Sequence, residues 1–289
     1  MDVSIRPPWS NNQLKRLGKA IRDGQEQGFA DLNYDDVLFW YNDLATAVRT
    51  QIASMSFFGL LGDDLVPRVS SRPKTIDTLR QKLLAHPSWQ LPAIIDLAGV
   101  RFEAAMNLET QTAVAMKIAD LLGQDFDVVA SDTRDEPHSG YRALHLRLSF
   151  PAGRVEVQVR TVGQGAWANA FEELADLTGR GIRYGERATD AFFEDVREHL
   201  IDYSKRVASL ERASTVHEQA RTSAIDFERR TGRLPFEKRV SERMRVQQAE
   251  EEFLEGLHHF NPIERQQAFV EILNELHDLL REWPREGGV

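Results

Sequence analysis

Residues 155–161 read Val-Glu-Val-Gln-Val-Arg-Thr and place a polar group at every second position. Alternate side chains of a β-strand point to opposite faces, so the valines are predicted to pack into a core. Glu156, Gln158 and Arg160 then share the other face, about 7 Å apart along the strand. Such a row lines up an acid, an amide and a cation on rigid backbone, where they can hold a polar ligand. The alternative is a half-exposed strand whose polar side faces water.

The preceding segment repeats this alternation. Residues 141–150 read Tyr-Arg-Ala-Leu-His-Leu-Arg-Leu-Ser-Phe, and a loop with proline and glycine follows at 151–154. This pattern predicts a hairpin of two strands. The shared polar face is predicted to carry Tyr141, His145, Glu156, Gln158 and Arg160. An aromatic ring can stack on a base and cations can hold phosphates, so this face favours a nucleotide.

Two isolated charges interrupt the apolar run at residues 94–102. A buried charge is costly, so Asp96 and Arg101 each need a partner or a ligand. One interpretation is an ion pair between these two side chains. The other makes Asp96 a Mg²⁺ ligand beside Glu156, because Mg²⁺ takes one or two carboxylates and completes its shell with phosphate and water.

Basic side chains gather further upstream. Arg72 and Lys74 alternate before a predicted helix that begins near Thr75 and carries Lys82. The sequence has no GxxxxGK[ST] or GxGxxG loop for phosphate binding. If the protein binds a triphosphate, side chains such as these must hold it. The alternative is a solvated helix face.

In order and in spacing, these segments resemble the synthetase domain of the RelA/SpoT family of alarmone synthetases. The resemblance covers about residues 35–187 and rests on five motifs. The motifs are Arg72-x-Lys74 with Lys82, Asp96-Leu-Ala-Gly-Val-Arg101, Ser139-Gly-Tyr-Arg-Ala-Leu-His145, Glu156-Val-Gln-Val-Arg-Thr161 and Trp167-Ala168. Residues 172–185 look like a branch of stand-alone members that includes toxin-type synthetases.

The resemblance implies that the β,γ-pyrophosphate of ATP moves to a ribose 3′-hydroxyl and that AMP is released. The implied ATP site has two arginines around the adenine and two lysines on the phosphates, namely Arg72, Arg101, Lys74 and Lys82. Asp96 and Glu156 would hold Mg²⁺, and Glu156 would also accept the proton of the attacking hydroxyl. Transfer of this kind depends on alignment and charge neutralisation.

On the acceptor side, the resemblance implies that Tyr141 stacks on the base. His145, Gln158 and Arg160 would line the same site. The acceptor would be GDP or GTP, which gives (p)ppGpp. For toxin-type members it would be the 3′ end of tRNA, and translation would be inhibited.

Two other observations bear on these alternatives. Arginines at positions 180, 183 and 187 would favour tRNA if they lay beside the acceptor site. A third class is a catalytically degenerate synthetase that acts as a binding or regulatory protein. The intact Asp96, Tyr141 and Glu156 argue against that class.

The sequence departs from the family pattern at three places. Pro73 stands where an aliphatic residue is usual, and because proline lacks a backbone donor its strand should lie at a sheet edge or end early. Phe171-Glu172 stands where many small alarmone synthetases have a Glu-His pair. His138 stands where many members have a basic residue.

The elements that position these groups predict an α+β fold, a mixed sheet with packed helices and an all-helical C-terminal extension. Residues 1–66 are expected to form helices that pack on the core, residues 67–187 the RelA/SpoT-like synthetase domain, and residues 188–289 the extension. A helical stripe begins near Phe192, and breaks are predicted at Gly232–Pro235 and near Asn261-Pro262. The stripe indicates intramolecular packing, a homo-oligomer contact or docking of an antitoxin.

Composition is that of an ordinary globular protein, with 289 residues, 42% of them hydrophobic. The chain has no cysteine, which excludes disulfides and thiolate metal sites and suits a reducing cytoplasm. No stretch has the length and apolar character of a signal core or a membrane span. A net charge of −9 argues against broad nonspecific nucleic-acid binding, although arginines make the predicted catalytic half basic.

Overall fold

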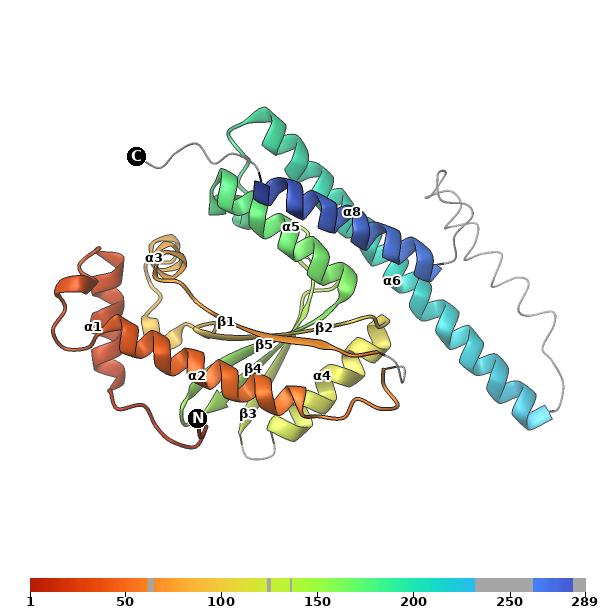
Figure 1. The fold of residues 1–289 in the computed structure, drawn as a ribbon, viewed down its shortest axis with the longest axis horizontal. Helices are drawn as coiled ribbons and strands as arrows, with labels where there is room; N and C mark the ends of the chain where they lie inside the picture. Colours follow the sequence, from red (N-terminus) through yellow and green to blue (C-terminus); the bar gives the residue numbers. More distant parts are fainter. Residues whose placement is uncertain (62–64, 124–125, 136, 232–261, 283–289) are drawn as a thin grey trace. The chain divides into compact units, whose positions relative to one another are not determined.

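The computed structural model describes residues 1–61, 65–123, 126–135, 137–231 and 262–282 (Figure 1). The chain divides into two compact units. The first comprises Met1–Ala105, Thr112–Asp132 and Ala143–Arg160, and the second comprises Met106–Gln111, Thr133–Arg142 and Thr161–Val289. The α+β prediction is confirmed. The predicted domain boundaries after residues 66 and 187 stay predictions.

A five-stranded mixed sheet forms the centre of the first unit. Its strands are β1 (Arg68–Pro73), β2 (Ala98–Ala104), β3 (Asp127–Asp132), β4 (Leu144–Phe150) and β5 (Gly153–Thr161). They lie in the order β1-β2-β5-β4-β3. The pairs β1/β2, β3/β4 and β4/β5 are antiparallel. Pro73 is the last residue of an edge strand, as its missing donor predicts.

The alternation in the sequence correctly predicts the β4/β5 hairpin. Val155, Val157 and Val159 are fully buried, and the polar residues between them lie on the opposite face. The prediction that Tyr141 belongs to this hairpin is wrong, because β4 begins only at Leu144. The backbone N–H of Tyr141 instead donates to the carbonyl of His138, 3.0 Å away, in a turn that precedes the strand.

Four helices accompany the sheet: α1 (Asn11–Arg22), α2 (Tyr34–Ala53), α3 (Ile76–Ala85) and α4 (Leu108–Leu122). Short 3-10 turns lie at Glu26–Gly28 and Leu91–Ala93. The hydroxyl of Thr75 caps α3, where the sequence predicts its start. Figure 1 shows α2 and α4 on one face of the sheet, where their apolar sides cover the core.

The described part of the second unit is mostly helical. It contains α5 (Val162–Thr178), a 3-10 turn (Arg180–Tyr184), α6 (Ala191–Thr231) and α8 (Pro262–Glu282). Leu200 and Val207 of α6 share a buried cluster with Leu273 and Leu280 of α8, so this stripe packs within the molecule. The break predicted at Gly232–Pro235 lies outside the described residues. Among those residues, no helix combines the length and apolar composition needed to cross a membrane.

Candidate functional site

Two lysines and one carboxylate meet beside α3. Lys74 directly follows β1, Lys82 lies on α3, and Asp96 precedes β2. Lys74 Nζ lies 2.6 Å from Asp96 Oδ2, and Lys82 Nζ lies 2.9 Å from Asp96 Oδ1. The alternative of an Asp96–Arg101 ion pair is therefore wrong, because both carboxylate oxygens bind lysines. These lysines come from segments that periodicity does not connect to Asp96.

Burial and charge oppose each other in this cluster. Burial lowers the pKa of Lys74, and the Asp96 carboxylate compensates only in part. Burial raises the pKa of Asp96, but the ammonium groups of Lys74 and Lys82 outweigh it and hold the pKa below its ordinary value. Asp96 is therefore ionised at neutral pH. A bound polyanion could replace Asp96 as the ion-pair partner of the two lysines.

The second group of polar side chains lies on the β4/β5 hairpin. His145 is paired with Gln158 across the two strands, and its Nδ1 lies 3.1 Å from Glu156 Oε1. Gln158 Nε2 donates to Glu156 Oε2 at 3.1 Å, and Arg160 Nη2 donates to Gln158 Oε1 at 2.6 Å. Four of the five residues predicted to share this face therefore form one chain of contacts. Tyr141 is not part of it.

Burial and neighbouring polar groups shift the pKa of the Glu156 carboxylate in opposite directions. Burial raises its pKa and the charge of Asp96 raises it further, while the His145 hydrogen bond and charge and the Gln158 hydrogen bond outweigh both. The pKa of Glu156 is thus held below its ordinary value. The carboxylate is ionised at neutral pH and is ready to bind a cation or to accept a proton.

A divalent cation fits this donor set. Asp96 and Glu156 belong to the same unit and their charges interact, so two hard oxygen donors are near each other. Within the described residues, no three His, Cys, Asp or Glu side chains are arranged to hold a metal together. Mg²⁺ suits such a sparse set, because it takes one or two carboxylates and completes its shell with phosphate oxygens and water.

The two predicted adenine-binding arginines lie on neighbouring strands. Arg72 is opposite Gly99, and Arg101 is opposite Ser70 in the β1/β2 register. Because residues two apart share a face, Arg72 and Arg101 are diagonal neighbours on one face of the sheet. Arg72 is exposed and Arg101 is half-buried. This placement suits contact with a planar group, which guanidinium planes can stack on.

Tyr141 belongs to the second unit, in a strained turn. Ser139 has φ 51° and Gly140 has φ 89°, both in the left-handed region that side chains other than glycine rarely adopt. Tyr141 is half-buried against the apolar cluster that contains Trp167. Trp167 is itself buried, and its indole N–H donates to the carbonyl of Leu200 at 2.5 Å. The motif Trp167-Ala168 therefore supports the turn from the core.

Replacing Gly140 with alanine is expected to destabilise the protein. A Cβ there would lie 2.7 Å from the Trp167 ring, and the positive φ adds strain. We expect the free energy of unfolding to fall by about 1–3 kcal/mol. Gly185 is the matched control, since it has the same φ of 89° but no atom within 4 Å of its Cβ position. Denaturant unfolding should show a larger loss for Gly140→Ala than for Gly185→Ala, and equal losses would contradict the predicted overlap.

The three arginines that would favour tRNA each have an acidic neighbour. Arg180 lies 2.8 Å from Asp176, and Arg183 lies 2.5 Å from Glu172. Arg187 is mostly exposed but lies 3.7 Å from Glu194. These pairs neutralise much of the positive charge of the segment. The segment is therefore a poor electrostatic track for a nucleic-acid backbone.

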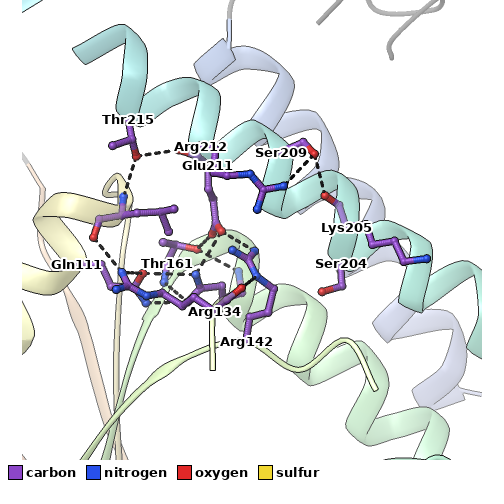
Figure 2. Close-up of polar contacts among 12 residues, drawn as sticks. Gln111, Arg134, Arg142, Thr161, Ser204, Lys205, Ser209, Glu211, Arg212 and Thr215 are labelled. Carbon is purple, nitrogen blue, oxygen red and sulfur yellow. Dashed lines mark hydrogen bonds and ion pairs between the residues drawn. The ribbon is translucent and has the colours of Figure 1, made fainter. Parts of the chain in front are cut away.

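One buried polar network was not predicted from the sequence. Arg142, one of the arginines counted toward a basic catalytic half, is 3% exposed and bonded to the buried Glu211 on α6 (Figure 2). Thr161 and Gln164, at the start of α5, bond to the same carboxylate. The signal for Glu211 is its spacing: Leu200, Ser204, Val207 and Glu211 fall on one helical stripe.

Comparison with known proteins identifies a family domain within the chain. The model of the region found in RelA / SpoT proteins matches residues 71–176. The chain contains a RelA/SpoT-family domain. This match spans β1 to α5 and includes the Lys74–Asp96 cluster and the Glu156 row.

The RelA/SpoT domain extends into a longer similarity with mycobacterial proteins. The uncharacterized proteins Rv1366 of Mycobacterium tuberculosis and Mb1401 of Mycobacterium bovis are each 48% identical over 187 residues. The aligned part is 65% of this chain and 66% of each relative, just under two thirds of their length.

Solved structures show the same fold for the RelA/SpoT domain. Small alarmone synthetase 1 from Bacillus subtilis, bound to its product pppGpp, matches with a TM-score of 0.52 and 21% identity. Small alarmone synthetase 2 from Bacillus subtilis matches with a TM-score of 0.50 and 18% identity. The similarity covers 66% and 65% of this chain and 98% of each solved chain. At this identity the comparison establishes the fold.

Proposed function

We propose that the protein is an ATP-dependent pyrophosphokinase that makes (p)ppGpp from GDP or GTP and releases AMP. The observation that carries the proposal is the pairing of two lysines with Asp96 in the unit that also holds the Glu156 row. Cations for phosphates and carboxylates for a metal and a proton are what this transfer needs. The family match and the fold of a pppGpp-bound synthetase support the same reaction.

The reaction assigns distinct tasks to the chain. Lys74 and Lys82 exchange Asp96 for the phosphates of ATP, and Arg72 and Arg101 hold the adenine. Asp96 and Glu156 would hold Mg²⁺, which would offset charge on the phosphate oxygens. These six residues form the ATP side of the proposed site.

On the acceptor side, Tyr141 stacks on the guanine base, and His145, Gln158 and Arg160 line the pocket for the nucleotide. The ribose 3′-oxygen attacks the β-phosphorus, and its proton passes to Glu156. The bond between the α,β-bridging oxygen and the β-phosphorus breaks, so AMP leaves with that oxygen. The lowered pKa of Glu156 keeps the proton acceptor ionised at neutral pH.

A transfer assay with γ-labelled ATP and Mg²⁺ tests the proposal. GDP, GTP and deacylated tRNA are offered in parallel, and we expect label on the guanine nucleotides. Label on tRNA instead would make the protein a toxin-type member and direct attention to an antitoxin. No label on any acceptor, with ATP still bound, would identify a degenerate binding protein and overturn the proposal.

Replacing Tyr141 with alanine should weaken binding of the acceptor nucleotide more than binding of ATP. Base stacking on an aromatic ring contributes about 1–3 kcal/mol, so the KM for GDP is expected to rise about 5- to 100-fold. Tyr141→Phe keeps the ring and should stay close to the wild type. Steady-state kinetics in both substrates measure the effect. Equal rises in the KM of GDP and of ATP would remove Tyr141 from the acceptor site.

A further inference from the structure

A fully buried carboxylate on α6 joins three segments of the second unit. The side chain of Glu211 has no exposed surface, and that of Arg142 is 3% exposed. Arg142 Nη1 donates to Glu211 Oε2 at 2.6 Å, and Thr161 Oγ1 donates to Glu211 Oε1. Gln164 Nε2 adds a longer hydrogen bond of 3.3 Å to Oε2. Figure 2 shows Arg142 and Thr161 converging on Glu211 from separate parts of the chain.

Stability alone is a weak reason for such a pair. Removing two charges from water costs several kcal/mol each, and apolar residues of similar volume often replace a buried ion pair without loss. A buried pair does fix geometry, because each partner has few other ways to be satisfied. What Glu211 fixes is the position of Arg142, whose Nε also donates to the carbonyl of Arg134 at 2.9 Å.

Arg142 directly follows Tyr141 in the chain. A second contact from α6 is made to Gly140, the residue that precedes Tyr141. The hydroxyl of Ser204 donates to the carbonyl of Gly140. Ser204 and Glu211 are seven residues apart, so they lie on one face of α6, two turns from each other. Helix α6 therefore makes hydrogen bonds to the residues on both sides of Tyr141.

The turn that contains Tyr141 depends on these hydrogen bonds from α6. Ser139 has a positive φ of 51°, which costs free energy for a residue other than glycine and persists where the surroundings fix it. Trp167 of α5 packs on Gly140. From α6, Ser204 binds the backbone carbonyl of Gly140 and Glu211 binds the side chain of Arg142. Without those contacts the turn can relax, and the Tyr141 ring would lose its defined orientation.

We propose that Glu211 is a positioning residue for acceptor binding, which it supports by holding Arg142 and thereby the Tyr141 turn. Helix α6 is then a working part of the acceptor site, although it lies beyond the matched family region. The inference rests on the proposed function through the role of Tyr141. Glu211 itself contacts neither substrate in this proposal.

Three variants of the full chain separate positioning from simple stability. Glu211→Gln leaves the Arg142 charge buried without its counter-ion. The double variant Glu211→Leu/Arg142→Met removes both charges and fills the space with apolar side chains. Asp202→Asn is the control on the same helix, since Asp202 is half exposed and pairs along the helix surface with Arg206.

Kinetics, unfolding and hydrogen exchange are measured for each variant. We expect the double variant to unfold close to the wild type and to show faster amide exchange at residues 138–142. Its KM for GDP should rise about tenfold, within the range that a stacked base contributes. Its KM for ATP should stay within about twofold of the wild type. Glu211→Gln should show the same selective rise in the KM for GDP together with reduced stability, and Asp202→Asn should change neither.

A double variant with wild-type exchange at 138–142 and wild-type KM for GDP would overturn the inference. Equal rises in the KM of both substrates would also overturn it, because they indicate general damage. If the wild type transfers to no acceptor, the proposed function fails instead. Hydrogen exchange at the Tyr141 turn then still decides whether Glu211 holds that turn.

Discussion

Replacing Glu156 with glutamine should abolish pyrophosphate transfer and leave the fold intact. The amide has the shape of the carboxylate, and its oxygen can still accept the hydrogen bond from His145 Nδ1, 3.1 Å away in the native protein. It cannot accept a proton from the 3′-hydroxyl, and it is a weaker ligand for Mg²⁺. Loss of a general base alone costs about 10²–10⁴-fold in turnover, and loss of a metal ligand adds to that.

The measurement is single-turnover transfer from labelled ATP, with circular dichroism and denaturant unfolding on the same samples. Asp127→Asn is the matched control, an acid-to-amide change at an exposed position on β3 of the same sheet. It should retain wild-type turnover. Near-normal turnover in Glu156→Gln would remove Glu156 from both roles. A large loss of stability would mean that the fold, and not the reaction, needs the charge.

Local patterns in the sequence were enough to predict the sheet that carries Glu156. The alternation of Val155, Val157 and Val159 with polar residues has the period of a strand, and burial follows it from Val155 to Val159. Pro73 predicted an edge for the same kind of local reason, since a missing donor cannot serve a central strand. Features with a period or a backbone constraint are therefore legible without the structure.

Contacts between residues far apart in the sequence could not be predicted in this way. Asp96 and Arg101 are close in sequence, yet Asp96 binds Lys74 and Lys82, which only the packing of β1 and α3 brings near. Tyr141 extends the alternation of β4 but lies in a turn, because the positive φ at Gly140 redirects the chain before Leu144. Hydrophobic spacing cannot report a backbone turn that is stabilised by contacts from a distant helix.

Replacing Asp96 with asparagine should cost both activity and stability, which distinguishes it from Glu156→Gln. The mutation removes a proposed Mg²⁺ ligand and the counter-ion of two lysines. Lys74 is mostly buried, with 15% of its side chain exposed, so its charge would lose its main compensation. We expect the free energy of unfolding at neutral pH to fall by about 1.5–3 kcal/mol, the effect of losing a hydrogen bond between charged groups. Transfer should fall below detection.

The pH dependence of that loss identifies its cause. The pKa of Asp96 is lowered in the folded protein, so its contribution is complete above the ordinary value of 3.8 and disappears as the pH falls through the lowered value. The stability gap between wild type and Asp96→Asn should therefore be constant from pH 7 to about 5 and close below that range. Asp77→Asn on α3 is the control, because Asp77 is 76% exposed and its ion pair with Arg80 should contribute less than about 1 kcal/mol. A gap that persists at low pH would show that side-chain packing, not the carboxylate charge, holds Lys74 and Lys82 in place.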